Sequence, residues 1–153
     1  MQDVTIYTDG GCNPNPGPGG WAALLLFEDE EDVAGRRKEQ RLKDGARDST
    51  NNRMELTAAL KALEALDAPA HVELHTDSRY LANAFNQGWL DSWQDNGWKT
   101  SSNKPVKNKD LWQKLLAAVE KHEVEWTWVK GHAGNPLNEL VDDMVGQARA
   151  KFE

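Results

Sequence analysis

Alternating apolar and polar side chains predict the strands that open the chain. Residues 4–9 alternate with a period of two, which is typical of a half-buried β-strand. The apolar run 21–27 predicts a buried strand, and the more polar residues 33–42 predict an edge strand. The acidic stretch 28–32 between them has the composition of a hairpin tip. We therefore expect an antiparallel meander at the start of the domain.

Glycine and proline mark the turns of this meander. A turn is expected at Gly10–Gly11, directly after the first strand. Residues 13–20 contain three prolines and three glycines, which disfavour helix and strand alike. The sequence therefore predicts a surface loop between the first two strands.

The rest of the chain alternates between helical and strand patterns. A helix is expected from a cap at Thr50 or Asn51 to about Leu66, because a short polar side chain can accept hydrogen bonds from the open N–H groups. Further helices are predicted over 78–85, 111–119 and 137–150, and further strands over 71–76 and 124–129. The stretch 86–109 is less regular. No repeat or linker divides the 153 residues, so a single domain, 1–153, is expected.

Two of the predicted strands end in the same dipeptide. Both strands finish in Thr-Asp: strand 4–9 ends in Thr8-Asp9, and strand 71–76 ends at Thr76, which Asp77 follows. The helix between them predicts a crossover connection, so the two strands should be parallel. Because the carboxyl ends of parallel strands meet at one edge of a sheet, we expect Asp9 and Asp77 to lie close together.

Two further carboxylates lie in predicted helices among apolar residues. Glu55 heads an otherwise apolar helical column and is expected to point inward. The alternative is a first-turn glutamate that only complements the helix dipole. Asp142 has apolar neighbours and is expected to face the sheet, with Asp143 as its exposed alternative.

Four carboxylates gathered in one cleft would require a countercharge, because like charges raise one another's pKa. Oxygen ligands suit Mg²⁺ or Mn²⁺, and no cluster of cysteine and histidine offers a zinc site. We expect two Mg²⁺ ions when substrate is bound, with Mn²⁺ as a substitute. Such ions would activate a water and stabilise a leaving oxygen in an in-line displacement at phosphorus.

One histidine has a setting that suits proton transfer. His132 lies in the glycine-flanked loop 130–136, where it can move, and histidine exchanges protons near neutral pH. The alternative is an ordinary loop histidine without a role. His71, His75 and His122 have no such setting and are expected to be structural.

Charge and cysteine content narrow the class of protein. The net charge of -7 lowers the expectation of a nucleic-acid partner, but Arg36–Lys38 and the lysines between 99 and 109 form local basic stretches that keep it open. The only cysteine, Cys12, fits a reducing compartment. No secretion signal or membrane-spanning run is recognisable, so a cytoplasmic protein without membrane contact is expected.

Taken together, the motifs resemble bacterial type 1 ribonuclease H. The matching stretches follow the family's order and span nearly the whole chain: 8–12, 15–20, 50–56, 76–78, 97–100, 104–108, 110–112 and 128–134. The resemblance implies an α/β, ribonuclease H-like fold, in which helices flank both faces of a five-stranded mixed sheet with an antiparallel meander and parallel strands. It also implies endonucleolytic cleavage of the RNA strand in RNA–DNA hybrids, leaving 3′-hydroxyl and 5′-phosphate ends.

The resemblance also implies roles for individual residues. The implied metal ligands are Asp9, Glu55, Asp77 and Asp142, and His132 would assist proton transfer or product release. The implied hybrid-binding residues are Cys12, Asn15, Thr50, Asn51, Asn52, Arg53, Trp89 and Lys99. Residues 86–109 would form the family's handle, a basic protrusion that grips the hybrid. A monomer without an obligate protein partner is expected.

The sequence departs from the family pattern in two places. Residues 94–96 of the handle are Gln-Asp-Asn, where relatives often carry a basic cluster, and Asp91 adds a negative charge. We therefore predict weaker hybrid affinity and a shallower salt dependence than in a relative with a basic handle. Residues 28–48 form a longer and more charged segment than in compact relatives, which predicts an extended hairpin without an assigned function. Trp93 and Trp98 are expected to pack within the handle.

Two other functions are compatible with this fold. A strand-transferring or resolving nuclease would use the same carboxylates but would not need Asn15 and Thr50–Asn52. A non-catalytic hybrid-binding module would gain nothing from four carboxylates next to phosphates. A cellular habitat with high salt would also explain the acidic surface.

Overall fold

One mixed sheet of five strands forms the centre of the computed structural model, which describes all residues, 1–153. The strands are β1 (Gln2–Cys12), β2 (Gly17–Glu31), β3 (Arg37–Ser49), β4 (Ala70–Thr76) and β5 (Glu123–Trp128). Their spatial order is β3-β2-β1-β4-β5. The helices are α1 (Asn51–Glu64), α2 (Arg79–Asn86), α3 (Trp89–Asp95), α4 (Lys109–Val119) and α5 (Pro136–Ala150). The predicted five-stranded mixed sheet is confirmed.

The strand directions bring two chain segments to one edge of the sheet. The strands β1, β2 and β3 pair antiparallel, as the predicted meander requires. The strand β4 pairs parallel with β1, with Thr8 opposite Thr76, and β5 pairs parallel with β4. The residues that follow Thr8 and Thr76 therefore leave the sheet side by side.

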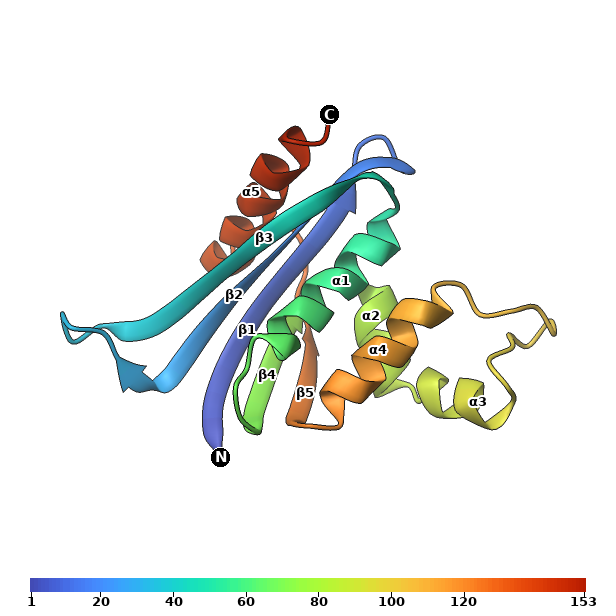
Figure 1. The fold of residues 1–153 in the computed structure, drawn as a ribbon, viewed down its shortest axis with the longest axis horizontal. Coiled ribbons are helices and arrows are strands. Elements are labelled where there is room, and N and C mark those ends of the chain that lie inside the picture. The colour runs from blue at the N-terminus through green and yellow to red at the C-terminus, as the bar shows by residue number, and fades with distance from the viewer.

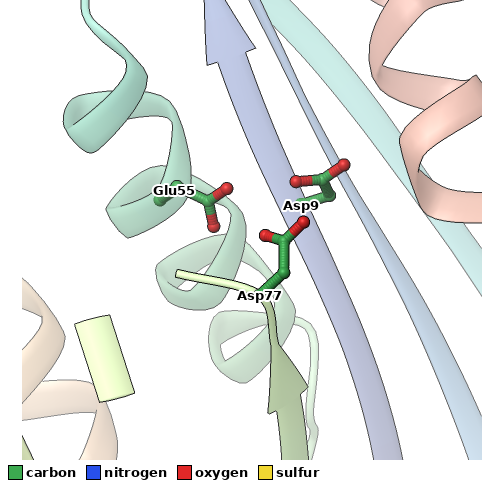
Figure 2. A group of neighbouring side chains, drawn as sticks. All are labelled: Asp9, Glu55 and Asp77. Atoms are coloured by element: carbon green, nitrogen blue, oxygen red, sulfur yellow. The ribbon is translucent and has the colours of Figure 1, made fainter. Parts of the chain in front are cut away.

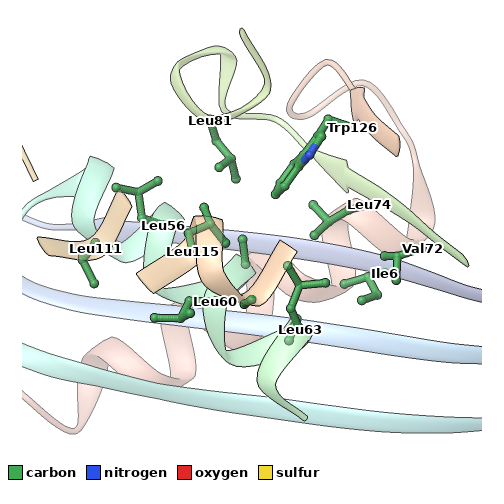
Figure 3. Close-up of a cluster of buried hydrophobic side chains, with 14 of the residues drawn as sticks. Ile6, Leu56, Leu60, Leu63, Val72, Leu74, Leu81, Leu111, Leu115 and Trp126 are labelled. Carbon is green, nitrogen blue, oxygen red and sulfur yellow. The ribbon is translucent and has the colours of Figure 1, made fainter. Parts of the chain in front are cut away.

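Helices cover both faces of the sheet (Figure 1). The alternation in β1 sends Val4 and Ile6 to the face under α1, where the larger core also includes side chains of α2 and α4. Figure 3 shows leucines of α1 and α4 packed over Ile6 and Leu74 in this core. Tyr7 points to the opposite face, where β2 and α5 form a smaller core. Each Å² of apolar surface that is buried on either face contributes about 25 cal/mol of stabilisation, and this burial holds the helices against the strands.

Two predictions were wrong where the end of β1 pairs with the glycine-rich start of β2. The expected turn at Gly10–Gly11 is instead the end of β1, which continues to Cys12. Residues 17–20 are not loop but strand, and Gly19 and Gly20 pair with Cys12 and Gly11. Glycine is needed here because a Cβ on Gly20 would lie 2.5 Å from the carbonyl oxygen of Val145 in α5.

The hairpin between β2 and β3 turns later than predicted. The acidic residues up to Glu31 still belong to β2, and the turn falls on residues 32–36, so the predicted strand 33–42 begins only at Arg37. The carboxylate of Asp32 caps this turn by accepting hydrogen bonds from the N–H groups of Ala34 and Arg36. Figure 1 shows the hairpin extending beyond the helices, as expected for the long 28–48 segment.

The handle region, residues 86–109, contains a helix that the sequence did not reveal. The helix α3 occupies residues 89–95 within the stretch expected to be irregular. Trp93 packs against Trp98 and Trp112, with ring centroids 6.2 and 5.6 Å apart, which confirms that Trp93 and Trp98 pack within the handle. None of the five helices is long and apolar enough to cross a membrane.

Candidate active site

Three carboxylates from three different elements meet at the edge of the sheet (Figure 2). Asp9 lies on β1, Glu55 lies on α1, and Asp77 follows the last residue of β4. One ligand oxygen from each lies within 4.8 Å of the others. Asp9 and Glu55 are only 5 and 6% exposed. The sequence-predicted meeting of Asp9 and Asp77, and the inward direction of Glu55, are therefore both present in the structure.

Local sequence places Glu55 over the end of β1. Thr50 caps α1, because its Oγ1 accepts a hydrogen bond from the N–H of Arg53, so Glu55 falls within the first two turns. Gly10 allows the helix to approach, since a Cβ there would lie 2.4 Å from the carbonyl carbon of Met54. The Gly10 N–H donates to Asp9 Oδ1 at 2.9 Å and to Glu55 Oε1 at 3.1 Å. One backbone group thus joins both carboxylates.

Asp142 lines the same cavity but is not part of the group of three whose ligand oxygens lie within 4.8 Å of one another. We call Asp9, Glu55, Asp77 and Asp142 together the carboxylate cluster. Asp142 lies on the half-buried side of α5, whereas Asp143 is exposed, as expected from the sequence. All four carboxylates line one open cavity of about 450 Å³. Gly10, Asn51, Asn52, Ser78, Arg79 and Tyr80 also line it.

Burial and mutual repulsion raise the pKa values of Asp9, Glu55 and Asp77. Burial, the charge of Asp77 and a hydrogen bond with Asp142 together raise the pKa of Asp9 to about 8, and burial has the largest effect. Burial, and then the charge of Asp9, raise the pKa of Glu55 well above its usual range. Burial also raises the pKa of Asp77, with the charge of Asp142 acting in the same direction. The cluster is therefore costly to ionise without a countercharge.

This donor set fits a hard divalent cation. The oxygens are carboxylates, which Mg²⁺ and Mn²⁺ accept as ligands, and the cluster contains neither sulfur nor imidazole. A bound cation would supply the positive charge that favours the ionised form of these carboxyl groups. The open side of the cavity leaves room for waters and for oxygens of a substrate.

His132 lies in the loop that passes over Asp77. It is exposed and has a φ of 55°, a left-handed conformation that turns the loop sharply. Its charge is one of the influences that lower the pKa of Asp77, against the larger effect of burial. The preceding Gly131 allows the close approach, since a Cβ there would lie 3.0 Å from Asp77 Oδ2.

Three of the predicted hybrid-binding residues, Cys12, Asn15 and Asn51, join one hydrogen-bond network. Asn51 Oδ1 accepts from the N–H of Cys12 at 2.7 Å, and the N–H of Asn51 donates to Asn15 Oδ1 at 3.0 Å. Thr50 caps the same helix, and Asn51 and Asn52 line the carboxylate cavity. Burial raises the pKa of the half-buried Cys12 thiol. This network lies directly beside the cluster.

Arg53 is held by a different set of contacts. Its guanidinium forms a bidentate pair with Asp110, at 2.9 and 3.1 Å, and donates to Asn108 Oδ1 at 3.2 Å. This hydrogen bonding lowers the pKa of Asp110 to about 2. Asn108 in turn donates to the Tyr80 hydroxyl. The pair therefore ties the first turn of α1 to the point where the handle region enters α4.

The handle places its two predicted contacts differently. Trp89 is half-buried against the main core, with its ring centroid 6.3 Å from that of Trp93. Lys99 is exposed and pairs with Pro105 in an isolated β-bridge. Lys99 is thus free to meet a partner, whereas most of Trp89 serves packing.

Sequence reasoning missed Ser78, Arg79 and Tyr80 as cavity residues. They follow Asp77 directly and form the start of α2, which Ser78 caps. Their position after a strand that ends at a carboxylate was the available signal.

Comparison with known proteins agrees with this geometry. The model of the RNase H family matches residues 1–150. Ribonuclease H of Dinoroseobacter shibae is 52% identical over 153 residues, which are all of this chain and 95% of the relative. Ribonuclease H of Hydrogenovibrio crunogenus is 54% identical over 97% of this chain and 96% of the relative.

Solved structures show the same fold. LC9-RNase H1, described as a type 1 RNase H with the type 2 active-site motif, superposes with a TM-score of 0.86 at 31% identity. The match covers 100% of this chain and 74% of that one. LC11-RNase H1, solved in complex with an RNA/DNA hybrid, has a TM-score of 0.68 at 23% identity, covering 97% of this chain and 98% of that one. With a family match over nearly its whole length and half of its residues shared with named relatives, this chain belongs to the ribonuclease H family.

Proposed function

We propose that this ribonuclease H hydrolyses the RNA strand of RNA–DNA hybrids at the carboxylate cluster, with Mg²⁺ as its natural cofactor. The observation that carries the proposal is the meeting of Asp9, Glu55 and Asp77, buried enough to hold protons that a cation would displace. The family supplies the substrate class, and the cluster supplies a place where phosphodiester chemistry can occur.

Asp9, Glu55, Asp77 and Asp142 would hold two ions when substrate is bound, and Mn²⁺ would substitute for Mg²⁺ because both accept oxygen ligands. When bound, such ions supply Lewis-acid activation of the attacking water and charge stabilisation at the leaving oxygen. The hydrogen bond from the Gly10 N–H to both Asp9 and Glu55 fixes the directions of these two carboxylates. Trp128 fixes the backbone of Asp77 in the same way, because its Nε1–H donates to the Asp77 carbonyl oxygen at 3.1 Å.

His132 would handle the protons of the reaction. Water attacks phosphorus, the bond from phosphorus to the 3′-oxygen breaks, and the products are a 3′-hydroxyl and a 5′-phosphate. The attacking water loses a proton and the 3′-oxygen gains one. His132 is exposed on a loop beside Asp77, where it can accept or donate a proton and help the product leave.

The surface next to the cluster would recognise the hybrid. Asn15, Thr50, Asn51 and Asn52 offer short amide and hydroxyl groups, which suit contacts with 2′-hydroxyls and phosphates. Cys12 lies in the same network, and Arg53 would act by holding the handle through Asp110. Lys99 and Trp89 would contact the hybrid from the handle. We expect a cytoplasmic monomer.

The test is a comparison of labelled duplexes with Mg²⁺. We expect cleavage of the RNA strand in an RNA–DNA hybrid, and no cleavage of double-stranded RNA, double-stranded DNA or the DNA strand of the hybrid. EDTA should abolish the cleavage. Cutting of the DNA strand would instead favour a resolving or strand-transferring nuclease, and binding without a product would favour a non-catalytic module.

A further inference from the structure

One arginine faces the carboxylate cavity. Arg79 is the first residue of α2, lies two positions after Asp77, and lines the cavity together with the four carboxylates. Arg79 is exposed to solvent. A cation is therefore built into the rim of a cavity whose other charges are negative.

This arginine does not neutralise the cluster. No carboxylate oxygen of the chain lies within 4.0 Å of its guanidinium, whereas Arg36, Arg37, Arg41, Arg53 and Arg149 each pair with a carboxylate. Its side chain also donates no hydrogen bond within the protein. All five guanidinium donors of Arg79 are thus available to a bound molecule.

The guanidinium is nevertheless held in place. It lies over the ring of Trp128, 4.5 Å from the ring centroid. Trp128 is one of the few exposed large apolar residues, at 38%, and its Nε1–H is tied to the Asp77 carbonyl oxygen. Stacking on an aromatic face leaves the edge of the guanidinium free, so it orients the donors without using them.

These observations indicate what the free donors bind. A phosphodiester that enters the cavity brings the next phosphates of its strand past the rim, and a planar guanidinium binds phosphate oxygens in a bidentate fashion. We propose that Arg79, oriented by Trp128, binds a backbone phosphate of the RNA–DNA hybrid next to the one that is cut. The assignment rests on the proposed function, because it adds a contact to the same substrate. The handle carries four lysines but also Asp91 and Asp95, and Arg79 adds substrate affinity at the site of cleavage itself.

The test compares Arg79→Gln, Arg79→Lys and the charge-matched control Arg36→Gln. Arg36 lies at the tip of the β2–β3 hairpin with 80% of its side chain exposed. The dissociation constant of a short RNA–DNA hybrid is measured in EDTA at several NaCl concentrations, and cleavage is then measured with Mg²⁺. We expect Arg79→Gln to weaken binding about fivefold to tenfold and to lower the magnitude of the slope of log K against log salt by about 0.9.

The controls separate this role from a structural one. Arg79→Lys keeps the charge and should restore the slope, Arg36→Gln should match the wild type, and all variants should unfold at wild-type temperatures. In steady-state cleavage, Arg79→Gln should raise KM while kcat stays within about twofold. An unchanged slope in Arg79→Gln, or a fall in kcat without a change in slope, overturns the assignment. A wild-type protein that fails to cut the hybrid overturns the proposed function instead.

Discussion

At the scale of single residues, Asp9 shows how the site couples folding to cation binding. The folded protein holds this carboxylate at 5% exposure, beside Asp77 and Asp142, with a pKa of about 8. An aspartate in an unfolded chain has a pKa near ~3.9. The proton that folding adds is the one that a divalent cation must displace, so metal affinity should rise with pH up to about 8.

The same shift predicts how stability depends on pH without metal. A carboxyl group whose pKa is raised on folding stabilises the fold fully below its unfolded pKa, and this contribution is lost as pH rises through the folded value. In EDTA, we therefore expect Asp9→Asn to unfold at a higher temperature than the wild type at pH 8.5. The gain should be about 2 kcal/mol, or roughly 4–8 °C for a domain of this size, and should shrink towards pH 5.

Thermal unfolding of both proteins at pH 5, 7 and 8.5 checks this prediction. Saturating Mg²⁺ should raise the melting temperature of the wild type more than that of the variant, because the variant lacks one ligand charge. If the variant is less stable than the wild type at pH 8.5 in EDTA, repulsion among the ionised carboxylates does not destabilise the folded protein, which contradicts the prediction.

At the scale of elements, the contact between β1 and α1 sets the position of Glu55. The prediction concerns Gly10, where a Cβ would lie 2.4 Å from the backbone of Met54, so no side-chain movement can relieve the clash. Gly10→Ala should push α1 away from β1, reduce kcat by about 100-fold or more, and destabilise the fold by about 2–4 kcal/mol. Cleavage rate and denaturant unfolding measure the two effects.

The next residue provides a matched control. A Cβ on Gly11 would meet only Asn51 Oδ1, at an ordinary contact distance of 3.6 Å. Gly11→Ala should therefore retain a cleavage rate within a few-fold of the wild type. Equal losses in the two variants would mean that the close approach at Gly10 does not position the site.

The elements also show what the sequence could predict. Period-two alternation, a capping Thr50 and the shared Thr-Asp strand ends were enough to bring Asp9, Glu55 and Asp77 together, because each is a local signal. The pairing of residues 17–20 was not predictable, because it depends on the approach of α5 to Gly20 from the far end of the chain. The engagement of Arg53 with Asp110 spans 57 residues and leaves no periodic trace.

At the scale of the whole molecule, the net negative charge opposes the binding of an anionic hybrid. The net charge is -7, and residues 91 and 94–96 of the handle region offer two aspartates and no cation. The available lysines, such as Lys99 and Lys104, are exposed. Hybrid binding should therefore release few counterions and depend weakly on salt.

Adding positive charge to the handle tests whether the charge of the handle sets the affinity for the hybrid. The double substitution Asp91→Lys with Asp95→Lys should tighten hybrid binding at low salt by more than tenfold and steepen the slope of log K against log salt by up to about 1.8. The paired control, Asp29→Lys with Asp32→Lys in the overhanging hairpin, makes the same change in net charge. If both pairs steepen the slope equally, overall charge rather than the handle governs binding.

The most direct test of the central claim compares the wild type with Asp9→Asn on a labelled RNA–DNA hybrid with Mg²⁺. This substitution keeps the shape of the side chain and removes one ligand charge from the cluster. We expect the wild type to cut only the RNA strand and the variant to be folded but slower by at least about 1,000-fold. A folded variant that cuts the hybrid as fast as the wild type would contradict the claim that the carboxylate cluster is the catalytic metal site.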